Sequence, residues 1–197
     1  DYTMNFKVMT AAILSASLTS FVSSNVMASD TTQSNREEAR GLVKQFGGQL
    51  KPELKKAMKS GGPVVAVEFC HSKAPAIAME LSEKSGWDVN RVSLKARGAM
   101  AKPDAWETQV LNDFNERKAA GEDISKMDFS EVIHEGDKTT FRYMKAVGTA
   151  EVCLTCHGTN VAEPIKQAIA KYYPQDNAMG FSKGDIRGAF SFSKVEK

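Results

Sequence analysis

Two cysteines three positions apart, followed directly by a histidine, carry the most specific chemistry in this chain. Residues 153–157 read Cys-Leu-Thr-Cys-His. Thiols at this spacing on a tight turn can each add to one vinyl group of a single protoporphyrin, and the adjacent imidazole then lies under the ring as an iron ligand. The pattern therefore predicts one covalently attached haem c, held by Cys153 and Cys156, with His157 as an axial ligand of the iron.

Two other chemistries also use a Cys-x-x-Cys pair. A structural zinc site would need about two further ligands, and the chain offers only Cys70, His71 and His134. A thioredoxin-like redox pair would follow a strand within a βαβ unit, and the residues around position 153 do not show that pattern. Haem attachment is favoured, and both alternatives remain open.

Cys70 is the third cysteine, and it has no disulfide partner if the other two hold haem. An unpaired thiol in an oxidising compartment needs an explanation. A thiolate is a competent iron ligand, which makes Cys70 a candidate for the second axial position. Its competitors are His71, Met100 and Met144. From the residues alone, a buried and inert cysteine is the more common outcome.

The first residues of the chain predict export. After Met4, which we take as the initiator, the chain has one basic residue, Lys7, an apolar and small-residue run at 8–22, and a small-residue cleavage site that ends at Ala28. This is the layout of a signal peptide. The run is too short and too rich in Ser and Thr for a membrane anchor, which needs about 20 predominantly apolar residues. Haem c is attached after export, so the expected location is the periplasm.

Length and charge predict a single domain behind this leader. We expect residues 1–28 to be the signal peptide with residues 1–3 as extra leading residues, 29–35 to be a flexible tail, and 36–197 to be one domain. The chain has 26 basic and 24 acidic residues and a net charge of +2. This balance gives no case for a nucleic-acid partner. We also expect no membrane span in the mature protein.

Helical patterns dominate the first half of the chain. Apolar residues at helical spacing predict a helix from near Asn35, weakened at 47–48 and either kinked or restarted at Pro52. Two glycines at 61–62, followed by a proline, predict an interruption. Residues 64–70 fit a buried strand or a buried helix, and we favour a helix. Further helices are expected at 75–85, 103–114 and 164–172.

Strand patterns follow in the second half. The runs 127–134 and 139–147 are joined by Glu-Gly-Asp-Lys, which predicts a β-hairpin. In the last run, alternation places Ile186 and Phe192 on the same face of a strand. The first strand is expected within 87–96. Helices followed by an antiparallel sheet predict an α+β fold.

Several motifs occur in a fixed order along the chain. They are Glu-Phe-Cys-His-Ser-Lys-Ala-Pro at 68–75, Pro-Asp-Ala-Trp-Glu at 103–107, Arg-Tyr-Met-Lys at 142–145, Cys-Leu-Thr-Cys-His-Gly at 153–158 and Gly-Asp-Ile-Arg-Gly-Ala at 184–189. Together they resemble an exported c-type haem domain family with a PAS-like fold, long catalogued as a domain of unknown function. The resemblance covers about 40–193. It implies a central antiparallel sheet flanked by helices, with an N-terminal helix, so that 36–197 forms a single PAS-like haem c domain.

The resemblance also implies the iron ligands. In the family, the iron is held by the motif histidine and by the cysteine of a Cys-x-x-x-Ala-Pro element. These residues correspond here to His157 and Cys70. Three arginines are candidates to pair with the haem propionates, because a guanidinium fork suits carboxylates. They are Arg91, Arg97 and Arg187.

This ligand set carries a functional expectation. An anionic thiolate opposite an imidazole favours ferric iron and a low potential, and a six-coordinate iron leaves no open position for a substrate. We therefore expect no enzyme, but a redox or small-gas sensor for NO or CO, which would need a separate signalling protein. The alternative is a periplasmic electron-transfer cytochrome with a redox partner protein.

Overall fold

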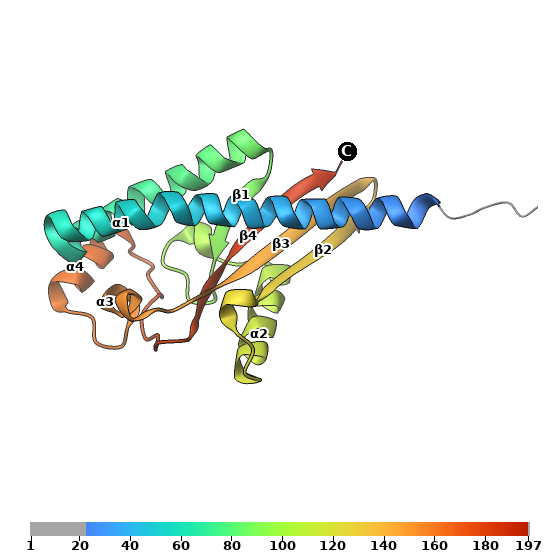
Figure 1. Ribbon diagram of the computed structural model, residues 1–197. Helices are drawn as coiled ribbons and strands as arrows, with labels where there is room; N and C mark the ends of the chain where they lie inside the picture. Colours follow the sequence, from blue (N-terminus) through green and yellow to red (C-terminus); the bar gives the residue numbers. More distant parts are fainter. Residues whose placement is uncertain (1–22, 197) are drawn as a thin grey trace, which may run out of the picture.

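In the computed structural model, the backbone is described for residues 23–196 and the side chains for residues 30–196. The chain has an α+β fold, as predicted (Figure 1). The helices are α1 (Ser23–Ser85), α2 (Ala105–Ala119), α3 (Leu154–His157) and α4 (Glu163–Tyr172), and the 3-10 turns are η1 (Ala99–Ala101), η2 (Ile124–Lys126) and η3 (Glu151–Cys153). The strands are β1 (Asp88–Val92), β2 (Asp128–Glu135), β3 (Lys138–Gly148) and β4 (Ile186–Glu196).

The predicted signal peptide, residues 1–28, lies mostly outside the described residues and stays a prediction. Across the part of the chain that is described, no helix has the length and apolar character needed to cross a membrane.

Helix α1 consists of two segments that meet at Gly62. The φ of 74° and ψ of −167° at this residue are not helical, and such a backbone is essentially restricted to glycine. Pro63 then starts the second segment, where its fixed φ suits the first turn of a helix. The interruption predicted at 61–62 and the helix predicted at 64–70 are both confirmed. The first segment continues through Pro52 without a break, and the second through Pro75.

The start of α1 differs from the prediction. The helix begins at Ser23 and not near Asn35, and residues 29–35, expected as a flexible tail, are helical. Tertiary contacts with the last strand explain the difference. Asn35 is buried and donates a hydrogen bond of 2.8 Å to Glu196, and Lys194 reaches Glu38 at 2.7 Å. These partners lie far away in the sequence.

The four strands form one antiparallel sheet in the order β1-β4-β3-β2. The predicted hairpin of β2 and β3 is confirmed. Each face of the sheet has its own core. Helix α1 packs on one face through a cluster that includes Phe46, Trp87 and Phe192, and α2 packs on the other through a cluster that includes Leu111 and Met144.

The last strand does not alternate as simply as predicted. Phe192 faces the α1 core, whereas Ile186 and Ala189 both face the α2 core. The predicted common face for Ile186 and Phe192 is therefore wrong. The pairing of β3 with β4 shifts register beside Gly188, and such an irregularity changes the face of the residues that precede it. A Cβ atom at Gly188 would lie 2.3 Å from the Val92 carbonyl oxygen, so this close approach requires glycine.

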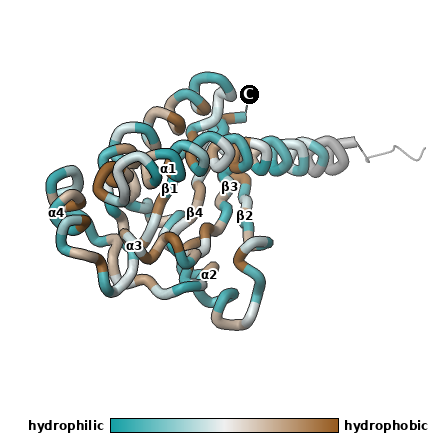
Figure 2. The backbone as a smooth tube through the Cα atoms, turned by 60° about the vertical axis from the view of Figure 1, so that its left-hand side comes forward, coloured by the Kyte–Doolittle hydropathy of each residue, from teal (hydrophilic) through white to brown (hydrophobic). Residues whose placement is uncertain are grey.

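The second segment of α1 packs against α4. Their shared cluster contains Val67, Ile165 and Ile169, with Cys156 and Tyr173 at its margin. Both α3 and α4 therefore lie at the end of the molecule where α1 is kinked, away from the hairpin turn (Figures 1 and 2). This packing positions the site described next.

Candidate functional site

The Cys-x-x-Cys-His residues occupy two short helical turns after β3. Cys153 ends η3, and Cys156 and His157 lie in α3. Residues three apart on a helical turn lie on the same side, so both thiols can face one planar ligand. The backbone before the turns is fixed by two hydrogen bonds of 2.8 Å, from Thr149 to the Asp185 carbonyl and from Gly184 to the Thr149 carbonyl. All three cysteines of the chain are free and partly buried.

His157 is held as a neutral imidazole with one free nitrogen. Its Nδ1 lies 2.7 Å from the Ala178 carbonyl oxygen, and because a carbonyl only accepts, Nδ1 carries the proton. Burial, followed by the positive charges of Arg187 and Arg97, lowers its pKa to about 3. The ring meets Phe181 edge to face at 6.2 Å. The Nε2 atom therefore carries no proton and has a lone pair available, which is the form that ligates metals.

Cys70 lies in the second segment of α1, and the fold brings it to the Cys-x-x-Cys-His turns. Burial raises the pKa of its thiol, and it is close enough to Arg91 and Cys156 for their charges to act on it. The thiol is therefore protonated at neutral pH unless a cation or metal stabilises the thiolate. Cys70 thus approaches the turns that carry Cys153, Cys156 and His157, the other three residues singled out from the sequence.

The competing ligand candidates lie elsewhere. Met144 is fully buried under α2, and Met100 is 81% exposed. The exposed His71 ring packs against the rings of Tyr172 and Tyr173 at 5.3 and 5.2 Å. His134 is exposed on the hairpin, where its Nδ1 meets Thr139 at 3.0 Å.

The alternatives to haem attachment are weakened by this geometry. Within the described residues, no three His, Cys, Asp or Glu side chains gather in a way that could hold a metal ion, whereas a structural zinc needs about four ligands. The strand before the motif, β3, belongs to a purely antiparallel sheet. A thioredoxin-like dithiol would be expected within a βαβ unit.

Three arginines surround the site, but they differ in their partners. Arg97 makes three polar contacts: its Nε pairs with Asp176 at 2.9 Å, and one Nη donates to the Cys156 carbonyl at 2.7 Å and to the Ala178 carbonyl at 3.2 Å. These acceptors could not be predicted from residue types, because two of them are backbone carbonyls. Asp176 itself had no motif that distinguished it from a surface carboxylate.

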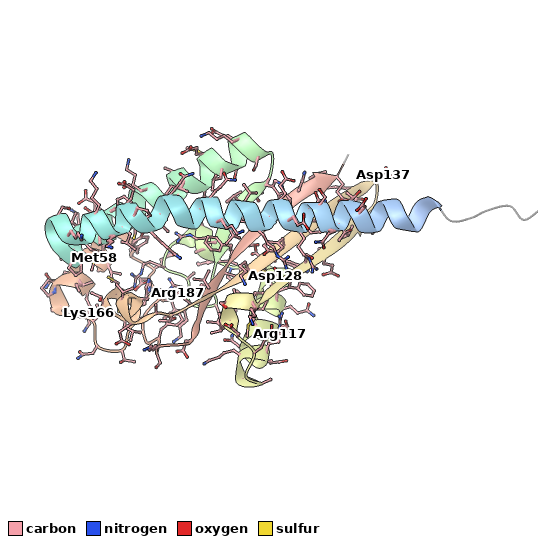
Figure 3. The ribbon with its side chains drawn as sticks, viewed as in Figure 1. Met58, Arg117, Asp128, Asp137, Lys166 and Arg187 are labelled. Carbon is pink, nitrogen blue, oxygen red and sulfur yellow. The ribbon has the colours of Figure 1, made fainter. Side chains whose placement is uncertain are left out.

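Within residues 30–196, Arg187 and Arg91 have no carboxylate at bonding distance. One Nη of Arg187 donates to Ser93 at 3.0 Å and to the Lys95 carbonyl at 3.4 Å, while its Nε is buried without a partner. Burial, with the repulsion of the neighbouring guanidinium groups, lowers the pKa of Arg187 to about 10. Figure 3 shows this side chain between the sheet and α3.

The Arg91 guanidinium stacks over the Phe46 ring at 5.0 Å, and burial lowers its pKa. Among residues 30–196 its side chain makes no hydrogen bond or ion pair. Buried charges are normally paired, so Arg91 and Arg187 leave the site with positive charge that an anionic ligand would balance.

Comparisons with known proteins identify the family of the chain. A profile of the Tll0287-like family matches residues 10–194. The crystal structure of the cyanobacterial heme-protein Tll0287 matches with 25% sequence identity and a TM-score of 0.60, and the match covers 81% of this chain and 96% of that one. No curated protein matches the chain. The family resemblance inferred from the motifs is confirmed, and the chain belongs to the Tll0287-like family.

Proposed function

We propose that this protein is an exported, periplasmic haem c protein with one haem, attached through Cys153 and Cys156 and ligated by His157 and Cys70. The observation that carries the proposal is a neutral His157 with an unprotonated Nε2, on the same consecutive turns as two thiols, with the Cys70 thiol of α1 in electrostatic range of Cys156. The related cyanobacterial protein is described as a heme-protein, which supports the same cofactor here.

The other residues of the site fit this group. A haem carries two propionates, which Arg187 and Arg91 are suited to receive. The Nε of Arg187 is buried without a partner, and Arg91 has no carboxylate partner among residues 30–196. Because Arg97 already pairs with Asp176, we expect Arg91 and Arg187 to pair with the propionates. When bound, the haem would supply one-electron redox chemistry and an iron centre able to bind small gases.

A sensor role is supported by the surroundings of Cys70. Its thiol pKa is raised by burial, so protonation is favoured whenever the metal holds the sulfur less strongly. Cys70 also lies on the segment of α1 beyond the Gly62 kink, which connects the site to the longest element of the molecule. We therefore favour an exchangeable Cys70 and a sensor of redox state or of NO or CO, acting through a separate signalling protein.

An electron-transfer role is supported by a different surface. Five lysines of the first segment of α1 make no ion pair in the described part of the chain: Lys44, Lys51, Lys55, Lys56 and Lys59. Lys55, Lys56 and Lys59 line an open hollow of about 500 Å³ with Pro52 and Ser60. These residues come just before the kink of α1, and the kink lies at the α4 end of the molecule (Figure 1). A positive face at this end of the molecule suits an anionic redox partner.

Covalent attachment is the first test. Acidic organic solvent extracts a noncovalent haem from denatured protein but leaves a thioether-linked haem on the polypeptide. We expect the pigment of the purified mature protein to stay on the chain, and to be extractable or missing in Cys153→Ser/Cys156→Ser. Free extraction of the pigment from the unaltered protein, or zinc without pigment, would contradict the proposal.

A further inference from the structure

The Ala178 carbonyl accepts two hydrogen bonds, and both come from the site. His157 Nδ1 lies 2.7 Å away, and an Nη of Arg97 lies 3.2 Å away. The same Nη donates to the Cys156 carbonyl at 2.7 Å, next to His157 in the chain. The Arg97 guanidinium therefore links Cys156, the residue before His157, to Ala178, whose carbonyl accepts the hydrogen bond from His157.

Asp176 completes this arrangement. One oxygen of its carboxylate accepts from Arg97 Nε at 2.9 Å and from the Ala178 backbone N–H at 3.0 Å. The side chains of Arg97 and Asp176 are only 12% and 8% exposed, so this is a buried ion pair with a defined geometry. Arg97 and Asp176 thus hold Ala178 from both sides, its N–H through the carboxylate and its C=O through the guanidinium.

The shared carbonyl has a chemical consequence for His157. A hydrogen bond at the far nitrogen orients a ligating imidazole and raises its basicity, the more so the stronger the acceptor. A carbonyl that already accepts from a cation has less electron density to offer a second donor. Arg97 therefore fixes the direction of the Nδ1 hydrogen bond and also moderates its strength.

We propose that Arg97 is a positioning residue for His157, which sets the orientation and the electron density of its imidazole through the Ala178 carbonyl. The inference rests on the proposed haem function, since it assigns Arg97 a role in tuning the iron through its ligand. A less electron-rich imidazole stabilises ferric iron less, so Arg97 raises the midpoint potential above the value that His157 and Cys70 alone would give.

The test separates this role from simple charge. Arg97→Lys keeps the positive charge but loses the planar fork that reaches several acceptors. Arg117→Gln removes an arginine that pairs with Glu122 at 2.6 Å and has no place in the proposed haem site, and serves as the matched control. The readouts are the NMR signal of the His157 Nδ1 proton, shifted by the iron, and the midpoint potential of the haem-loaded protein.

We expect Arg97→Lys to shift the Nδ1 proton signal and lower the potential, and Arg117→Gln to leave the proton signal unchanged. Asp176→Asn, which weakens the hold on Arg97, should shift the proton signal as well and provides a second variant if Arg97→Lys does not fold. An unaltered proton signal in both Arg97→Lys and Asp176→Asn, or an equal shift in Arg117→Gln, would overturn the proposal.

A haem-free measurement distinguishes failure of this inference from failure of the proposed function. In haem-free protein at neutral pH, the ¹⁵N signals of His157 should show an Nδ1–H imidazole, and Arg97→Lys should increase exchange of that proton with water. If these signals behave as expected but the protein never takes up haem, the positioning role stands and the haem assignment fails. Equal exchange in both proteins would contradict the positioning role itself.

Discussion

The side chains around His157 divide into possible iron ligands and unpaired cations. The ligand atoms are electrically neutral in the protein alone, because burial keeps His157 unprotonated and the Cys70 thiol protonated at neutral pH. The positive charge lies on Arg91 and Arg187, for which the described residues offer no carboxylate at bonding distance. This combination suits a ligand that brings both a metal and negative charge.

Cys70→Ala tests the ligand assignment. We expect haem to remain covalently attached, because both attachment cysteines are intact, while the low-spin thiolate spectrum disappears and the midpoint potential rises. His71→Ala is the matched control, since His71 is the next residue but packs on Tyr172 and Tyr173. It should leave the spectrum unchanged. An identical low-spin spectrum in Cys70→Ala would remove the thiolate from the proposal.

Arg187→Met tests the pairing with propionates. Thermal unfolding of haem-free and haem-loaded protein gives the stabilisation due to haem, and a charged hydrogen bond contributes about 1.5–3 kcal/mol. We expect Arg187→Met to reduce that stabilisation by about this amount. Arg117→Met, which removes an arginine already paired with Glu122 at 2.6 Å, should leave it unchanged. Equal stabilisation by haem in the two variants would exclude Arg187 as a partner.

At the scale of elements, α1 links the sheet to the site. Its first segment covers one face of the sheet, and its second carries Cys70 to α4 and the Cys-x-x-Cys-His turns. The direction of the second segment depends on the backbone of Gly62, and the first segment is tied to the sheet by Arg40 and Asp128.

Gly62→Ala should distort the kink. A side chain at φ 74° and ψ −167° is strained, so we expect a loss of about 1–3 kcal/mol in the free energy of unfolding, measured by urea titration. Gly48→Ala is the control, because Gly48 is exposed and helical and a Cβ there meets no atom within 4 Å. It should stabilise the protein by about 0.5–1 kcal/mol. Similar effects of the two substitutions would mean that the kink does not depend on glycine.

Asp128 should make stability depend on pH. Burial alone would raise its pKa, but hydrogen bonds from Arg40 at 2.8 Å and Tyr143 at 3.1 Å outweigh burial and hold the pKa below its usual value. Figure 3 shows Asp128 on β2. A folded-state pKa below the unfolded value of about 3.9 gives stability that is complete above that pH and is lost as the pH falls through the folded value.

Asp128→Asn should therefore lower the free energy of unfolding by about 1–2 kcal/mol at pH 7. The difference from the unaltered protein should shrink below about pH 4. Asp137→Asn, in the exposed turn of the hairpin, is the control and should change stability by less than about 0.5 kcal/mol. A loss for Asp128→Asn that is the same at pH 7 and pH 3 would contradict the proposed role of its charge.

At the scale of the whole molecule, the candidate functions place different demands on the fold. A sensor must change its shape or its ligands when the iron is reduced, whereas a carrier works best when neither changes. The thiol of Cys70 favours the first, and the unpaired lysines of α1 favour the second.

Reduction of the haem-loaded protein separates the two functions. For a sensor we expect the reduced form to bind NO or CO and to change its hydrogen-exchange protection in the second segment of α1. Cys70→Ala should bind NO in both the ferric and the ferrous state, because the competing sulfur is gone. No gas uptake and no change in protection on reduction would favour the electron carrier.

Sequence by itself determined the features that depend on neighbouring residues. The Cys-x-x-Cys-His turn, the interruption at 61–62, the β2–β3 hairpin and the α+β order were all predictable, because spacing and backbone preference act over a few residues. The motif order also indicated the family, and with it Cys70 as a candidate ligand.

Only the tertiary structure decided which distant groups meet. It brought Cys70 into electrostatic range of Cys156, extended α1 through residues 29–35 by contacts with β4, and turned Ile186 toward the α2 core. It also showed that Arg97 is occupied by Asp176 and two backbone carbonyls. Every residue has a backbone carbonyl, so the residue types do not show which carbonyl accepts a hydrogen bond. Long-range contacts form only when the whole chain has folded.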